Sequence, residues 1–128
     1  MTDIKMLSGG TLAFLGDAIW SLYVRDYLVN LGYNRPNDLQ VKSVKMVSAK
    51  AQKMFFDSLN ESNFFTEDEL YYFKRGRNFS SKTTPKNTDV GTYHYSTGFE
   101  ALVGYLYLEK QNERIDEIFN RAKEMVKV

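Results

Sequence analysis

The chain has 128 residues, of which 43% are hydrophobic and 15% aromatic, so it has enough apolar material to fold and is not a disordered chain. It has no cysteine and only one histidine, which excludes disulfide scaffolds, cysteine zinc sites, iron–sulfur clusters and thiol nucleophiles. The net charge is +1, no apolar run approaches the length of a membrane span, and the N-terminus lacks the pattern of a secretory signal. We therefore expect one domain over residues 1–128, located in the cytoplasm and without a membrane partner.

Apolar residues recur at helical spacing along most of the chain. The first helix is expected over residues 11–31, with Gly32 in the position of a C-terminal cap. The turn at 35–38 should begin a second helical segment that runs towards residue 59. Ser48 lies in the middle of that segment and is a candidate cap, which would divide it into two helices.

The second half of the chain also predicts helices. Thr66 and Glu69 have the spacing of a capping box, which indicates a short helix to about residue 77. Segment 78–92 is rich in Ser, Thr, Asn, Lys and Gly, and is predicted to be the one extended loop. A further helix is expected from about Ser96 to residue 110, and Asn112 should cap a last, amphipathic helix. No segment alternates as a strand does, so the predicted fold class is all-α.

The basic residues are concentrated in two parts of the chain. Segment 35–53 has five basic residues and one acid, and segment 74–86 has five basic residues and no acid. A nearly neutral protein with such a distribution can bind a polyanion through one face, although solvated helices also carry lysine. The second segment has no acids to balance its charge, and its candidate phosphate-binding residues are Lys74, Arg75, Arg77, Lys82 and Lys86.

Asp17 is a lone acid within a strongly apolar helix. An acid in such surroundings is costly unless a hydrogen bond, a basic partner or a metal ion compensates for it. Its neighbour Gly16 costs about 1 kcal/mol relative to alanine inside a helix, and such a glycine usually marks the close approach of another helix or a ligand. The alternative to a functional role is that Asp17 is a buried structural acid.

Glu100 is the corresponding lone acid of a second apolar helix. It follows Thr97 by three residues, so it could instead complete a capping box with that threonine. If the two helices pack face to face, Asp17 and Glu100 meet and repel each other, and a divalent cation would relieve the repulsion. Oxygen ligands without histidine or cysteine suit Mg²⁺ or Mn²⁺, and such a site can hydrolyse a phosphodiester bond.

Several motifs, in this order along the chain, together resemble the ribonuclease III family. The first, at residues 15–18, resembles the signature helix of the family, and that at 99–108 resembles its second acidic helix. The segments between them resemble the Mini branch of the family, which lacks a separate domain for binding double-stranded RNA. These segments are residues 74–78, 84–90 and 93–97.

The resemblance implies an all-helical endonuclease bundle that works as a homodimer and cuts double-stranded RNA with Mg²⁺, for which Mn²⁺ may substitute. It implies Asp17 and Glu100 as catalytic metal ligands. We expect the Thr97 hydroxyl to orient a water molecule or the metal, and the basic residues of 74–86 to contact RNA phosphates. The products would be 5′-phosphate and 3′-hydroxyl ends. The Mini branch is associated with the maturation of 23S ribosomal RNA precursors, with a ribosomal protein as a potential helper.

The chain departs from the pattern of full-length ribonuclease III enzymes at two positions. Those enzymes carry acids at the positions that correspond here to Ala13, Asp17, Thr97 and Glu100, so two of the acids are missing. This leaves open a non-catalytic RNA-binding scaffold with the same fold. A helical protein-interaction module is a third alternative, and it predicts no salt-dependent affinity for RNA.

Overall fold

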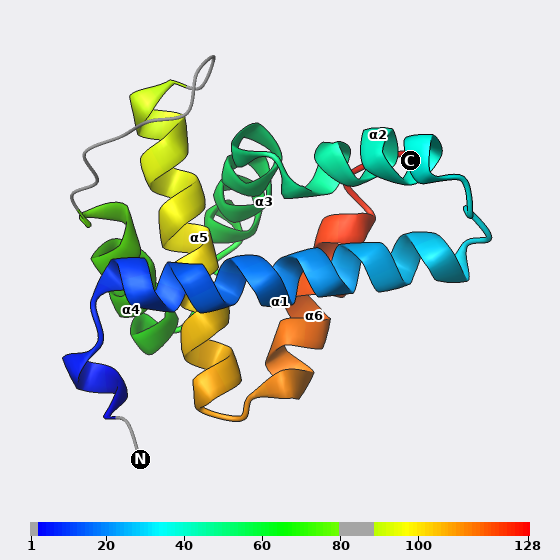
Figure 1. Ribbon diagram of the computed structural model, residues 1–128. Helices are drawn as coiled ribbons and strands as arrows, with labels where there is room; N and C mark the ends of the chain where they lie inside the picture. Colours follow the sequence, from blue (N-terminus) through cyan, green and yellow to red (C-terminus); the bar gives the residue numbers. More distant parts are fainter. Residues whose placement is uncertain (1–2, 80–88) are drawn as a thin grey trace.

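The structure is a computed structural model that describes residues 3–79 and 89–128, and these residues form helices, turns and short connections only (Figure 1). The predicted all-α class is therefore confirmed. None of the described helices is both long and apolar enough to cross a membrane. In chain order the helices are the short 3-10 helix η1 (Ile4–Met6), α1 (Gly9–Asn30), α2 (Pro36–Val47), α3 (Ala49–Glu61), α4 (Glu67–Arg77), α5 (Val90–Leu108) and α6 (Asn112–Lys123).

Local capping explains most of the helix boundaries. Gly32 follows the end of α1 with a φ of 102°, a conformation that favours glycine, and this ends the helix where the sequence predicts. Pro36 occupies the first turn of α2. The hydroxyl of Ser48 accepts a hydrogen bond from the Ala51 N–H at 3.2 Å, so the predicted division into two helices is confirmed. The capping box at the start of α4 is also present.

Two predicted boundaries are wrong. Helix α5 begins at Val90 rather than near Ser96, because the Asp89 carboxylate caps it by accepting from the Thr92 N–H at 3.1 Å. The end of the predicted loop 78–92 is therefore helical, and its middle, residues 80–88, lies outside the described residues. Asn112 is the first residue of α6 and not its N-cap, because Gln111 occupies the N-cap position.

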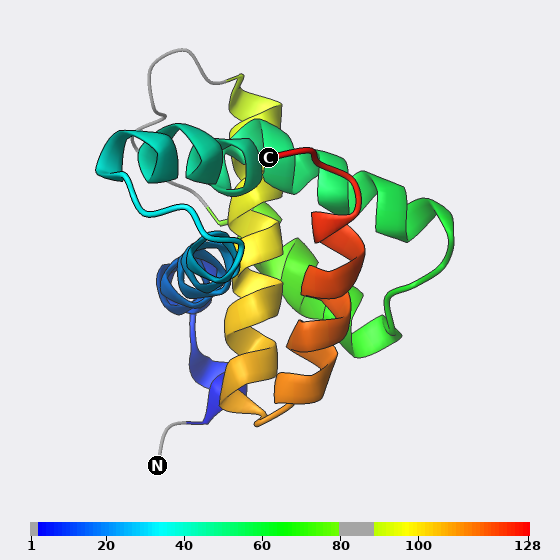
Figure 2. The ribbon, with the colours of Figure 1, turned by 90° about the vertical axis from the view of Figure 1, so that its right-hand side faces the viewer.

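The core forms where α1 crosses α5. The two helices cross directly in Figure 1, and in Figure 2, where α1 is seen nearly end-on, it lies against the side of α5. Trp20 of α1 is fully buried at this crossing. Its indole N–H donates to the Met46 carbonyl at 2.9 Å, and its ring meets that of Phe99 edge-on at a centroid distance of 4.8 Å. Helices α3, α4 and α6 also pack on α5, which makes it the central helix of the bundle.

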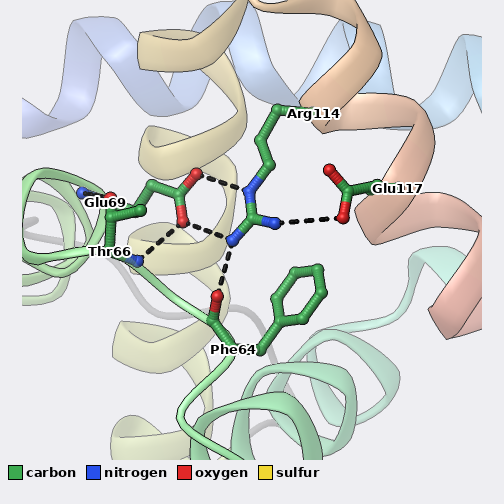
Figure 3. Close-up of polar contacts among 5 residues, drawn as sticks. All are labelled: Phe64, Thr66, Glu69, Arg114 and Glu117. Carbon is green, nitrogen blue, oxygen red and sulfur yellow. Dashed lines mark hydrogen bonds and ion pairs between the residues drawn. The ribbon is translucent and has the colours of Figure 1, made fainter.

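A buried ion pair links α4 to α6 (Figure 3). The Arg114 guanidinium donates to both carboxylate oxygens of Glu69, at 2.8 and 2.9 Å, and to the Phe64 carbonyl at 2.6 Å. Glu69 also accepts from the Thr66 N–H, as part of the capping box, at 2.9 Å. The Glu69 carboxylate therefore both caps α4 and holds α6 in place.

Candidate functional site

A pocket of about 300 Å³ opens beside the crossing of α1 and α5. It is lined by Asp17 and Glu100, the two lone acids of the sequence. Ala13 and Thr97 also line it, at the positions where the resemblance implies acids in full-length ribonuclease III enzymes. The lining residues are Gly10, Ala13, Phe14 and Asp17 from α1, Tyr93, Thr97 and Glu100 from α5, and Phe79 after α4. Residues 83 positions apart in the sequence thus meet because two helices cross.

Two glycines allow the helices to come this close. A Cβ atom on Gly16 would fall onto the backbone carbonyl of Glu100, and one on Gly104 would fall onto the carbonyl of Leu12. The predicted close approach at Gly16 is therefore confirmed, and its partner is another helix. Because Asp17 follows Gly16 directly, the contact between backbones brings the Asp17 side chain to the same pocket as Glu100.

The two structural alternatives for these acids are wrong. Asp17 is exposed, so it is not a buried structural acid. Thr97 and Glu100 lie in the middle of α5 and do not form a capping box at its start. The Thr97 hydroxyl instead donates to the Tyr93 carbonyl one turn earlier, at 3.0 Å.

The pocket is unfavourable for two negative charges. Burial, the hydrogen bond shared with Asp17 and the negative charge of Asp17 together raise the pKa of Glu100 to about 8, against the opposing effect of a hydrogen bond from Gln52. Near neutral pH the pair therefore tends to retain a proton in the absence of a cation.

Gln52 is a residue of the site that the sequence analysis did not identify. Its side chain is only 1% exposed, and its Nε2 group donates to Glu100 Oε2 at 3.3 Å. One feature of the sequence could have pointed to Gln52, because it is a polar residue on the apolar face of its helix. Ala51 and Phe55 on the same face are both buried core residues. Its contact with Glu100, far along the sequence, could not be deduced from that pattern.

None of the basic residues of α4 lines the pocket, although the end of the helix lies near it. The end of α4 packs closely on α5 at Gly76, and Phe79 lies on Gly10 at the edge of the pocket. Lys74 is exposed, and the Nε of Arg77 donates to the Asn78 side chain at 3.3 Å.

Arg75 is engaged elsewhere. Its guanidinium donates to the carbonyls of Lys5 and Leu7, at 2.9 and 3.0 Å, and to the Tyr71 hydroxyl at 2.7 Å, which fixes the N-terminal segment to α4. Arg75 lines a pocket that is separate from the pocket of Asp17 and Glu100. Lys82 and Lys86 lie outside the described residues.

The pocket fits a Mg²⁺ ion. Within residues 3–79 and 89–128 no group of three or more acidic, histidine or cysteine side chains could hold a metal. Mg²⁺ commonly uses only one or two protein carboxylates, completed by water and phosphate oxygens. Asp17 and Glu100 supply two carboxylates. Burial first, and then the hydrogen bond with Asp17 and its negative charge, raise the pKa of Glu100, and a bound cation would favour its ionised form.

The fold is that of a known class of enzyme. Residues 10–111 match the family model of the ribonuclease III domain, so the chain belongs to the ribonuclease III family and is an endoribonuclease. Within this family its relatives are Mini-ribonuclease 3 enzymes. It is 48% identical to that of Enterococcus faecalis, covering 94% of this chain and 91% of the relative. It is 47% identical to that of Staphylococcus aureus, covering 92% and 88%.

A solved structure has the same fold. A crystal structure of a protein from Fusobacterium nucleatum is 37% identical to this chain, with a TM-score of 0.85. The match covers 97% of this chain and 98% of the other. The predicted membership of the Mini branch is confirmed by the Mini-ribonuclease 3 relatives.

Proposed function

We propose that this protein is a Mg²⁺-dependent endonuclease that cuts double-stranded RNA and matures the ends of 23S ribosomal RNA precursors in the cytoplasm. The observation that carries the proposal is the meeting of Asp17 and Glu100 in one pocket next to the basic end of α4. The choice of substrate follows from membership of the Mini branch. The single catalytic domain is proposed to span residues 1–128.

Asp17 and Glu100 are the proposed ligands of the cation, directly or through water, and Mn²⁺ is expected to substitute for Mg²⁺. A bound cation supplies charge stabilisation at the scissile phosphate and lowers the pKa of water. The Thr97 hydroxyl gives its hydrogen to the Tyr93 carbonyl, so its oxygen remains as an acceptor towards the pocket that it lines. This suits a role in orienting water there. The products are expected to be 5′-phosphate and 3′-hydroxyl ends.

The RNA is proposed to lie across the pocket and the end of α4. Phosphates of an A-form duplex are recognised mainly by charge and shape. A substitution of Lys74 should therefore weaken binding of all duplexes alike and make the affinity less dependent on salt. The proposed phosphate contacts are Lys74, Arg75, Arg77, Lys82 and Lys86, with Arg75 also serving the internal contacts described above.

We propose a homodimer, with each pocket cutting one strand. Phe14 supports it, because this phenylalanine lines the pocket and remains 82% exposed in the single chain. A large exposed apolar side chain beside a functional site is typical of an association surface. A ribosomal protein that reshapes the precursor is a further proposed partner.

The proposal is tested by a cleavage assay on a perfect RNA duplex and on a 23S precursor, with Mg²⁺ and with Ca²⁺, for the parent and Asp17→Asn. We expect cleavage by the parent with Mg²⁺, binding with little cleavage in Ca²⁺, and no cleavage by Asp17→Asn, which should still bind RNA. Binding without cleavage of either RNA by the parent would contradict a nuclease.

Binding of RNA without cleavage would instead favour an RNA-binding scaffold of the same fold. The observation on its side is that Ala13 and Thr97 line the pocket at positions where full-length relatives carry acids. Against it, Asp17 and Glu100 would serve no purpose facing RNA phosphates without a cation, because they would repel them.

A further inference from the structure

Gln52 of α3 donates a side-chain hydrogen bond to Glu100 in the acidic pocket. Its two amide hydrogens have two acceptors, Glu100 Oε2 and the Val47 carbonyl, each at 3.3 Å from Nε2. Apart from the hydrogen bond shared with Asp17, the Glu100 carboxyl receives no hydrogen bond from another side chain among the described residues. Once a cation takes the place of the shared proton, one buried amide remains as the donor that orients this carboxylate.

The amide is held in place by the junction between α2 and α3. Val47 is the last residue of α2, and Ser48 separates the two helices. The backbone N–H of Gln52 donates to the Ser48 carbonyl at 3.0 Å, so both the backbone and the side chain of Gln52 are bound to this junction. A side chain anchored in this way presents Nε2 to Glu100 in a fixed direction.

Stability alone does not account for a glutamine at this position. The Gln52 Oε1 atom is buried and has no hydrogen-bond partner among the described residues. An unsatisfied buried acceptor costs about 1–3 kcal/mol, which offsets much of what the two hydrogen bonds from Nε2 contribute to stability. The small net gain in stability favours a second role for the glutamine, which is what its Nε2 group does at Glu100.

We propose that Gln52 is a positioning residue that holds the Glu100 carboxylate in the orientation that binds the divalent cation. The inference rests on the proposed metal-dependent function. Groups that orient metal ligands typically change metal affinity or activity by about 10- to 100-fold when they are removed. The same size of effect is expected here.

The test replaces Gln52 by methionine, which has a similar shape but cannot donate. Binding of Mn²⁺ without RNA is measured by calorimetry, and cleavage is measured as a function of Mg²⁺ concentration. We expect Gln52→Met to bind Mn²⁺ about 10- to 100-fold more weakly and to need correspondingly more Mg²⁺ for half-maximal cleavage. The rate at saturating Mg²⁺ should change much less. The unfolding temperature should change little, because the substitution removes the unpaired Oε1 atom together with the two hydrogen bonds from Nε2.

Two further variants separate positioning from a general effect on folding. Ser96→Ala removes another buried polar side chain, whose hydroxyl donates only to the Tyr93 carbonyl, and should bind Mn²⁺ as the parent does. Gln52→Asn keeps the amide but shortens its reach, and should be as weak as Gln52→Met. It also provides the test if the methionine variant does not fold.

Several outcomes would overturn the inference. One is that Gln52→Met or Gln52→Asn, folded, binds Mn²⁺ within about twofold of the parent, well short of the expected loss. Another is that the loss of affinity follows a fall in unfolding temperature and is shared by Ser96→Ala. In both cases a parent that cuts RNA with Mg²⁺ leaves the proposed function intact. A parent that neither binds Mn²⁺ nor cuts RNA would remove the proposed function, and the inference with it.

Discussion

At the scale of single residues, the carboxyl group of Glu100 couples folding to pH. Its pKa rises from about 4.5, the ordinary value, to about 8 in the folded protein, through burial and the nearby Asp17. Between these two values the folded state retains a proton that the unfolded state has lost. The free energy of unfolding of the metal-free protein must therefore fall as the pH rises through this range, and level off above it.

Glu100→Gln removes this ionisation. With a chelator present to keep the protein free of metal, the variant should have a larger free energy of unfolding than the parent at pH 8. This difference should shrink towards pH 5 and disappear below about pH 4.5. Thermal unfolding across this pH range measures the difference. Glu61→Gln, at an exposed glutamate at the end of α3, is the control and should show no such trend. A stability difference between Glu100→Gln and the parent that does not change with pH would contradict the raised pKa.

At the scale of helices, the site is built by the contact between the backbones of α1 and α5. Gly16 and Gly104 each face a carbonyl of the opposite helix, with no room for a side chain between them. The distance between the helices, and with it the distance between the main chains at Asp17 and Glu100, is set by main-chain atoms rather than by adaptable side chains. The backbone that carries both acids is therefore tightly packed without any ligand.

Gly16→Ala should therefore destabilise the fold by at least about 2 kcal/mol, because the added methyl group must push two backbones apart. Denaturant unfolding measures this cost. Gly91→Ala is the matched control, since among the described residues a Cβ there would meet only the Asp89 side chain, at 3.3 Å. It should leave stability unchanged or raise it by up to about 1 kcal/mol. Equal effects of the two substitutions would show that the crossing is not tightly packed.

The ion pair between α4 and α6 is a second contact between helices. Arg114→Met should cost about 3 kcal/mol, because it leaves the Glu69 carboxylate, only 2% exposed as a residue, without its partner. Adding Glu69→Gln to Arg114→Met should recover much of that loss, since the glutamine can still accept from the Thr66 N–H. Denaturant unfolding of the parent, both single variants and the double variant gives the coupling free energy between Arg114 and Glu69. Purely additive costs would mean that the pair contributes nothing specific.

The sequence predicts those helix features that depend on near neighbours. The caps at Ser48 and Thr66 act within three residues, so they are visible in the sequence. The start of α5 is missed because its cap, Asp89, lies in a polar segment that resembles a loop. The meeting of Asp17 with Glu100 is anticipated from the cost of lone acids and from the resemblance. The part played by Gln52 depends on a contact between helices that no local pattern encodes.

At the scale of the whole molecule, α1 is too apolar for the surface that it buries within one chain. Phe14 and Leu22 remain 82% and 65% exposed, although other residues of α1 form the core. Phe14 also lines the acidic pocket, so association through this helix would bring a second chain next to the site.

Phe14→Ser should therefore weaken the proposed dimer, with a reduced sedimentation coefficient at micromolar concentration. Its unfolding temperature at high protein concentration should fall towards that of the monomer. Met6→Ser is the matched control, because Met6 is equally exposed but lies outside α1 and outside the pocket. A parent that sediments as a monomer, or a Phe14→Ser variant that remains a dimer, would contradict this interface.

Helix α1 has a consequence for how the protein can evolve. Within three turns it supplies core residues, the glycine of the crossing, an acid of the pocket and an exposed phenylalanine, on different sides of the helix. Helix α6, in contrast, buries one stripe and leaves the rest in solvent. A complete substitution map should therefore show intolerance around the whole circumference of the first half of α1, and intolerance that repeats every three to four residues along α6.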